Sequence, residues 1–392
     1  MRAADPKLLE APVEDRKRVT SLELFFDLVF VFAITQVSTF VASSPTWTRL
    51  LEGMAILAVV WFAWSCYAWL GNTADAEQEL VRVMLLGAMA AMLIVSLAVP
   101  HAFGADALIF GVAYFVVRLA HIGTYTLVAR AQHDTTLASV VGRLSSTMLP
   151  AAALLVLAGA LSSGTARAVC WVAALGVDYG GIVARGVEGW RINPSHFAER
   201  HGLIIIIALG ESIVSLGVGA SRIPLGARVI VGALLGIAVA AALWWAYFDV
   251  VALVAERRLQ TADEREQALI ARDSFTFLHL PMVAGIVLFA IGVKRALIHL
   301  DTHLGAVGAT ALCGGIALYL LSLSALKRRN IGSFNRPRIV VAAILVALIP
   351  AARAVPALVA IALVACAACG LIAFELVRYN ESRARIRHLG SE

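Results

Sequence analysis

The chain has 392 residues, of which 60% are hydrophobic and 15% are charged, and its formal net charge is +6. A soluble domain carries roughly 25% charged and roughly 45–50% apolar residues, so this composition indicates a chain that folds in lipid and leaves no room for a soluble catalytic domain. The basic residues stand at the ends of apolar runs and form no patch on an amphipathic element. This placement argues against nucleic acid as a partner and for the lipid bilayer.

Twelve apolar runs along the chain are each long enough, or nearly so, to cross about 30 Å of hydrocarbon as a helix. Charged residues or Pro and Gly clusters separate them. We therefore expect an all-α polytopic membrane bundle with transmembrane helices at residues 21–43, 49–71, 80–99, 106–129, 136–161, 166–186, 197–219, 226–252, 268–293, 304–326, 338–353 and 355–378.

The distribution of Lys and Arg predicts the orientation of these helices. With the N-terminus inside, the flanks assigned to the cytoplasm hold twenty of these residues, and the outer flanks hold seven. Cytoplasmic flanks carry the excess of positive charge in membrane proteins. We expect both termini in the cytoplasm, with an N-terminal tail at 1–20 and a basic C-terminal tail at 380–392.

Three short matches recur in the same order in the two halves of the chain. The dipeptides Asp15-Arg16 and Glu199-Arg200 each stand eleven residues before a second acid, Asp27 and Glu211, at an offset of 184 residues. The other two matches pair 64–67 with 244–247 and 73–75 with 261–263. This pattern predicts an internal duplication.

The duplication predicts how the chain is divided. We expect a first six-helix repeat at 21–186, a cytoplasmic linker at 187–196 and a second six-helix repeat at 197–379. Six spans per repeat give both halves the same orientation, so the expected symmetry axis runs along the membrane normal. Parallel repeats of this kind place a working site between the halves.

Acidic residues at membrane depth are the main candidates for function, because each costs about 2.5–3.5 kcal/mol to insert. Glu23 and Asp27 share one face of the first span, and Glu211 lies in the seventh with Arg200 about three turns earlier. We expect Asp27 and Glu211, equivalent by the repeat, to face each other near the axis and to bind an ion or small solute, with Glu23 as an auxiliary acid.

Further ionisable residues within the spans are expected to support these acids or to titrate beside them. His279, which precedes Pro281 and a predicted kink, is a candidate for the ion-binding set. The expected supporting residues are Arg200, Arg272, Arg118, Arg143, His121 and Asp178. The alternative is that these groups pair between helices only to determine which span packs against which.

Other patterns carry less chemistry. The five cysteines lie in apolar segments, and their odd number argues against a disulfide framework. His299 and His303 have helical spacing but lie in a loop, and we expect no metal site and no cofactor. Gly176 and Gly180 have the small-residue spacing of close helix packing.

Three segments resemble a known family. The run from Ser21 through Glu23 and Asp27 to Ala33, the run from Glu199 to Ser212, and His279-Leu-Pro281-Met-Val-Ala-Gly285 are similar to motifs of the bacterial low temperature requirement A family. The resemblance implies a multi-spanning protein of the bacterial inner membrane that is linked to growth in the cold. It implies no established chemistry.

Two classes of function therefore remain. The first is a transporter or channel for an ion or small solute, which leaves a homo-oligomer open. The second is a membrane-embedded enzyme that acts on a lipid or an isoprenoid carrier, for which Asp249, Asp273 or His196 would supply the acid and base.

Overall fold

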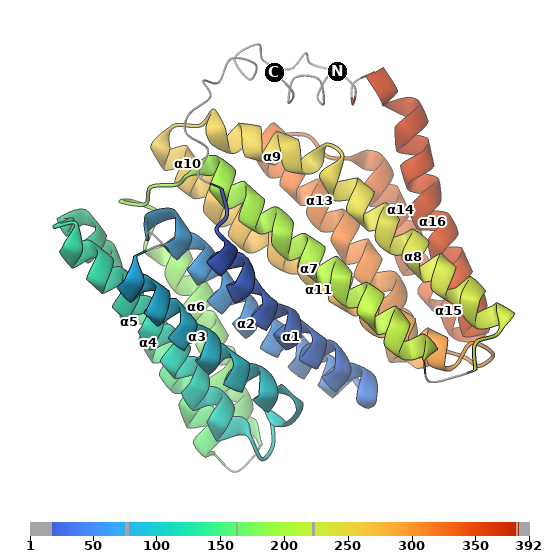
Figure 1. Cartoon of the computed structure of the whole chain (residues 1–392). Coiled ribbons are helices and arrows are strands. Elements are labelled where there is room, and N and C mark those ends of the chain that lie inside the picture. The colour runs from blue at the N-terminus through green and yellow to red at the C-terminus, as the bar shows by residue number, and fades with distance from the viewer. Residues whose placement is uncertain (1–17, 75–77, 162–163, 222–223, 382, 384–392) are drawn as a thin grey trace.

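The computed structural model describes residues 18–74, 78–161, 164–221, 224–381 and 383, and all elements in that part of the chain are helices (Figure 1). Twelve helical segments there are long and apolar enough to cross a membrane. The chain is therefore a multi-pass membrane protein with the expected all-α fold. The expected tails at 1–20 and 380–392 lie mostly outside the described residues.

The first six spans are continuous helices, and three of them, α1, α2 and α5, have N-termini capped by short polar side chains. The Thr20, Thr46 and Asp134 side chains accept hydrogen bonds from backbone amides three residues later, which satisfies donors that a helix start leaves free. These spans are α1 (Ser21–Ser43), α2 (Trp47–Thr73), α3 (Glu79–Ala98, extended by the 3-10 turn η2, Val99–His101), α4 (Ala107–Ala131), α5 (Thr135–Ala160) and α6 (Thr165–Ala184).

The last six spans include several that are interrupted. They are α7 (Pro194–Ala220), α8 (Ala227–Phe248) with α9 (Val251–Gln260), α10 (Glu264–Ile270) with η3 (Ala271–Phe277) and α11 (Leu278–Ile298), α12 (Gly305–Ala309) with η4 (Thr310–Gly314) and α13 (Gly315–Ile331), α14 (Arg336–Ala347) with α15 (Ile349–Ala354), and α16 (Ala357–Arg378). The eighth and ninth spans are longer than the sequence indicates, because α9 and α10 continue them beyond the apolar core.

A π-helical turn, η3, stands directly before Pro281 in the ninth span. Proline has no amide hydrogen to donate to the carbonyl four residues earlier, which here belongs to Phe277, the last residue of η3. The irregularity expected at this proline is therefore a widened turn on its N-terminal side. This turn directs the side chains of Arg272 and Thr276 toward the first half of the chain, where both line a pocket.

The helices form two groups, α1 to α6 and α7 to α16, which Figure 1 shows side by side. Contacts between the groups come mainly from α1 and α2, which pack against α7 and α11. The first helix begins and the last helix ends at the same end of the bundle (Figure 1). The two groups divide the chain where the predicted repeats divide it, and the duplication itself stays a prediction.

Close helix packing depends on other glycines than those the sequence indicated. A side chain at Gly111 would meet the backbone of Leu155 in α5, and one at Gly292 would meet the backbone of Leu312. Gly176 and Gly180 have open space beside them, so the packing expected there is wrong. The reason is that α6 lies at the periphery of the bundle, because only 28% of its most apolar stretch is buried.

Candidate functional site

Glu23 and Asp27 lie one turn apart on α1 and are both buried. Glu23 is fixed by the start of its own helix: its amide donates to the Thr20 hydroxyl over 3.3 Å, and the Thr20 amide donates to its carboxylate over 2.9 Å. This reciprocal arrangement is a capping box. The local sequence therefore holds the first acid in place before any other helix packs against it.

Arg200 of α7 contacts both acids. Its Nη1 lies 3.0 Å from Glu23 Oε1 and its Nη2 lies 2.7 Å from Asp27 Oδ1. Trp64 Nε1 of α2 donates to the same Asp27 oxygen over 2.9 Å, and His196 Nε2 lies 3.1 Å from Glu23 Oε1. We term Glu23, Asp27, His196 and Arg200 the acid–arginine cluster. It joins the two helical groups through buried charge, where one cation serves two carboxylates.

Glu211, also on α7, is 1% exposed and lies in a different environment. Its carboxylate accepts hydrogen bonds from the hydroxyls of Thr35 and Ser38 on α1, the latter over 2.5 Å, and from that of Ser215 on α7 over 2.8 Å. We term these four residues the Glu211 cage. Its donors come from both helical groups, and all three are hydroxyls.

Asp27 and Glu211 do not face each other, and this expectation was wrong. The contacts between α1 and α7 keep one register, 173 residues, in both the Asp27–Arg200 pair and the Ser38–Glu211 pair. The two acids stand 184 residues apart in the sequence. The difference of eleven residues displaces them along the parallel helices by about 16 Å, at about 1.5 Å per residue.

Buried apolar side chains fill the space between the two clusters. Phe30, Ile34 and Val37 on α1 and Ile204 and Ala208 on α7 are all at most 2% exposed. The interface between the groups is therefore a polar cluster toward one end, an apolar layer, and the Glu211 cage beyond it. The two polar sites belong to one interface but are separate sites.

Three of the predicted supporting residues lie inside the first group instead. Arg118 Nη2 of α4 is 2.7 Å from Asp178 Oδ1 of α6, and its Nη1 donates to Cys66 Sγ of α2 over 3.0 Å. His121 Nε2 lies 3.0 Å from the carbonyl oxygen of Cys66. These contacts hold α2, α4 and α6 together, as in the packing alternative, and do not touch Asp27 or Glu211.

His279 lies in the second group, away from both acids. Its Nδ1 is 2.8 Å from the Ser274 carbonyl oxygen, its Nε2 is 2.9 Å from the Tyr247 hydroxyl, and its ring stacks on Phe275. Both ring nitrogens are engaged, and the ring makes an edge contact with His201 of α7. His279, which we predicted to bind the ion, therefore lies in an aromatic core.

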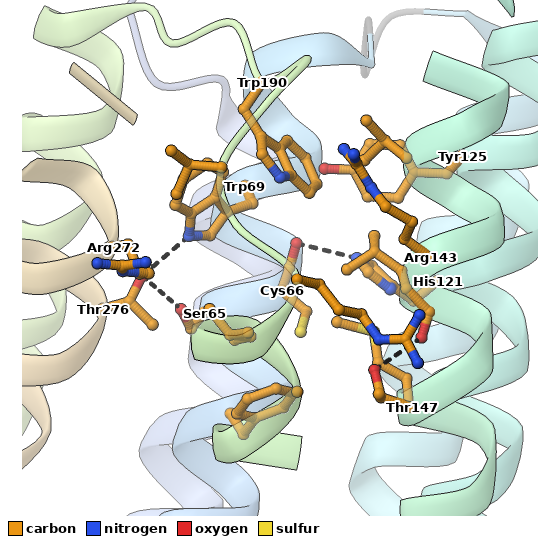
Figure 2. A pocket seen from close by; sticks show the side chains of 18 of the residues that line it. Ser65, Cys66, Trp69, His121, Tyr125, Arg143, Thr147, Trp190, Arg272 and Thr276 are labelled. Carbon is orange, nitrogen blue, oxygen red and sulfur yellow. Dashed lines mark hydrogen bonds between the residues drawn. The ribbon is translucent and has the colours of Figure 1, made fainter. Parts of the chain in front are cut away.

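The remaining predicted residues, Arg143 and Arg272, line a pocket at the end of the first group (Figure 2). Arg143 of α5 donates to the carbonyl oxygen of Glu188. Arg272 pairs through its Nε with Asp273 Oδ1 at 2.7 Å, and Arg329 contacts the other oxygen of Asp273 at 2.9 Å. Neither arginine reaches the buried acids.

Several buried polar contacts escaped the sequence reasoning. Thr35 and Ser38 gave no signal because hydroxyls in membrane helices commonly bond to their own backbone. Lys294 of α11 is buried and its Nζ lies 3.2 Å from Thr39 Oγ1. Arg338 and Glu375 form a two-point ion pair at 2.8 and 2.9 Å. The sequence places each of these charges near a span end, where a snorkelling side chain is the ordinary interpretation.

The family model described as bacterial low temperature requirement A protein (LtrA) matches residues 18–373. A protein of Rhizobium meliloti (strain 1021), named "Uncharacterized protein RA0937", is 30% identical over 329 residues, which are 80% of this chain and 78% of that protein. No solved structure matches the chain.

Proposed function

The chain belongs to the bacterial low temperature requirement A family, and we propose that it is a proton-coupled transport protein whose two helical groups move against each other, with Glu211 as the acid that carries the proton. It would act in the bacterial inner membrane with both termini in the cytoplasm. The observation that carries this proposal is the chemistry of the Glu211 cage.

Each hydroxyl of the cage that belongs to α1 has a second acceptor on its own helix. The Thr35 hydroxyl also lies 3.0 Å from the Val31 carbonyl oxygen, and the Ser38 hydroxyl lies 3.0 Å from the Thr35 carbonyl oxygen. A hydroxyl can donate one hydrogen bond and can also accept. When Glu211 is ionised the hydroxyls donate to it. When it is protonated, one of the two α1 hydroxyls can turn to its backbone acceptor and accept the hydrogen bond of the carboxyl O–H.

The cage thus satisfies both protonation states of a buried carboxyl group, which supports a site where a proton is bound and released. The acid–arginine cluster has the opposite property. An arginine carries only donors and stays charged, so Arg200 favours ionised Glu23 and Asp27 and loses its partners if they are protonated. This cluster suits a fixed contact between the groups.

The enzyme alternative has weaker support from the structure. Asp249 is held by Arg383 Nη2 at 2.5 Å, Asp273 by two arginines, and His196 by Glu23. A general acid or base needs free access to the proton that it transfers. Each candidate for that role is committed to a partner, whereas Glu211 sits in an environment that accepts either charge state.

The proposal is tested with the full-length protein reconstituted in liposomes. Charge movement under an imposed pH gradient is recorded on a solid-supported membrane, with mixtures of amino acids, sugars and small organic acids on the outer side. We expect currents for the wild type that reverse with the gradient and are lost in Glu211→Gln. The control is Glu79→Gln, which removes an exposed acid at the start of α3. Wild-type currents equal to those of protein-free liposomes would contradict the proposal.

A further inference from the structure

The pocket at the end of the first group lies between α2, α4, α5 and α6, with η3 at its side. It encloses about 690 Å³, counting the open space at its mouth. Figure 2 shows Trp69, Trp190 and Tyr125 around it, with Arg143 and Arg272 on different sides. None of its lining residues belongs to the acid–arginine cluster or to the Glu211 cage, so a ligand in this pocket would bind apart from the proposed proton site.

The lining of this pocket carries positive charge without an acid. Arg143, Arg185 and Arg272 contribute to it, and no Asp or Glu is among the lining residues that the structure describes. Arg272 is compensated by Asp273 outside the pocket. Within the described part of the chain, Arg143 and Arg185 form no ion pair. One Arg143 nitrogen donates to the Glu188 carbonyl oxygen, which leaves the positive charge of both arginines uncompensated and able to bind an anion. We term this cavity the arginine pocket.

The pocket wall also contains a buried ring nitrogen, His121 Nδ1, without a hydrogen-bond partner. His121 is 1% exposed and lines the cavity. Its Nε2 is occupied by the Cys66 carbonyl oxygen, while its Nδ1 is buried without a hydrogen-bond partner. A buried polar atom that stays unpaired costs free energy, and a polar ligand group that pairs with Nδ1 would remove that cost.

The inner wall of the pocket is apolar. Phe62 on α2, Leu144 and Met148 on α5 and Ile182 on α6 line it together with the arginines. Arg185 directly follows α6, Arg143 lies in the third turn of α5 and Arg272 lies near the start of η3, so all three come from the same end of the bundle. Basic pockets between membrane helices bind phosphate-bearing headgroups, and guanidinium groups bind phosphate in a two-point geometry.

From this arrangement we propose that the arginine pocket binds an amphiphile whose phosphate headgroup carries a net negative charge, with the phosphate on Arg143 and Arg185 and the apolar chain along Phe62, Leu144 and Met148. The same chemistry is found in an acidic membrane phospholipid and in a soluble alkyl or prenyl phosphate. No bond is made or broken. The pocket is a binding site.

The test uses the purified full-length protein, delipidated in an uncharged detergent and studied by native mass spectrometry and thermal unfolding. The probes are phosphatidylglycerol, phosphatidylcholine, dodecyl phosphate, dodecanol and inorganic phosphate. We expect phosphatidylglycerol or dodecyl phosphate to stay bound and raise the unfolding temperature, while the other three do not. Displacement of phosphatidylglycerol by dodecyl phosphate at low concentration indicates a soluble ligand, and the reverse indicates a lipid.

Variants locate the binding in the pocket. Arg143→Gln combined with Arg185→Gln is expected to weaken binding of the preferred probe about tenfold or more, because hydrogen bonds to charged groups are lost. Arg130→Gln removes an exposed arginine at the same end of α4 and is expected to bind as the wild type does. If the double variant does not fold, the comparison among probes on the wild type still decides.

Three results would overturn the proposal. They are equal binding of phosphatidylglycerol and phosphatidylcholine together with no binding of dodecyl phosphate, binding of inorganic phosphate as tight as that of dodecyl phosphate, or unchanged binding in the double variant. The first result would show that binding does not need net negative charge. The second would show that the apolar wall does not contribute, and the third that the two arginines do not.

Discussion

The two buried acidic sites between α1 and α7 differ in the donors that surround them, and this difference determines what each can do. Asp27 accepts from an arginine and from an indole N–H, and neither of these can accept a hydrogen bond. Glu211 accepts from hydroxyls, which both donate and accept. One site therefore fixes charge, while the other tolerates its loss.

Arg200→Gln is expected to destabilise the protein by about 3–5 kcal/mol, because it leaves two carboxylates buried without their cation. The measurement is thermal unfolding in detergent. The control is Arg228→Gln, which breaks an ion pair with Asp301 whose side chains are 71% and 69% exposed, and exposed pairs contribute about 0–1 kcal/mol. Equal losses of unfolding free energy in the two variants would show that the buried cluster stabilises the protein no more than an exposed ion pair does.

Asp27→Asn in the Arg200→Gln background is expected to recover part of that loss, since it removes one of the two uncompensated charges. A double-mutant cycle on unfolding free energies measures the coupling, which for a shared buried ion pair is about 0.5–3 kcal/mol. Strict additivity of the two changes would mean that the pair, 2.7 Å apart here, makes no net contribution.

The sequence identified the buried acids and their arginine but not their geometry. Glu23, Asp27, Arg200 and Glu211 stand out because ionisable residues are rare at membrane depth. Their arrangement depends on the register in which α1 and α7 pack, and nothing in either helix alone determines a contact offset of 173 residues. The repeat offered a different offset, and following it placed the acids opposite each other.

At the scale of helices, close packing in this bundle depends on a few glycines that face a neighbouring backbone. Gly111→Ala is expected to destabilise the protein by about 1–3 kcal/mol, because its Cβ would meet the Leu155 carbonyl in a contact that only a shift of α5 can relieve. Gly176→Ala has open space around it and is expected to be neutral or slightly stabilising. Unfolding in detergent measures both, and a larger loss at Gly176 would contradict the α4–α5 packing.

Spans were predictable to within a few residues because hydropathy determines them, whereas their internal irregularities were not. The π-helical turns η3 and η4 carry no sequence signal beyond Pro281, which only follows the first of them. The failure at Gly176 and Gly180 has the same origin, because small-residue spacing does not say whether a neighbouring helix lies on that face.

Over the whole molecule, two pockets open at the same end of the bundle, one mainly among the helices of the first group with η3 beside it, and one among the helices of the second group. The second, lined by Asp249, Lys327, Arg338 and Glu375 among others, lies between α8, α13, α14 and α16. These are the second, fourth, fifth and sixth spans of their group, as α2, α4, α5 and α6 are of theirs. This agreement in position supports the predicted duplication, although the charges that line the two pockets differ.

The excess of basic residues predicts that this end faces the cytoplasm. Single cysteines placed at Glu188 and at Thr302, in a background without native cysteines, lie at opposite ends of the bundle and are exposed. A membrane-impermeant maleimide is expected to label the cysteine at position 302 in intact cells, and the one at position 188 only after the membrane is opened. The reverse pattern would mean that the topology is inverted.

The proposed transport depends on a change of protonation at Glu211, and infrared difference spectroscopy of the reconstituted protein measures this most directly. As the pH is lowered stepwise, the account predicts a carboxylic acid C=O band in the wild type and in Glu79→Gln that is absent from Glu211→Gln. Spectra of the wild type and of Glu211→Gln that coincide over the whole pH range would contradict it, because Glu211 would then keep one charge state throughout.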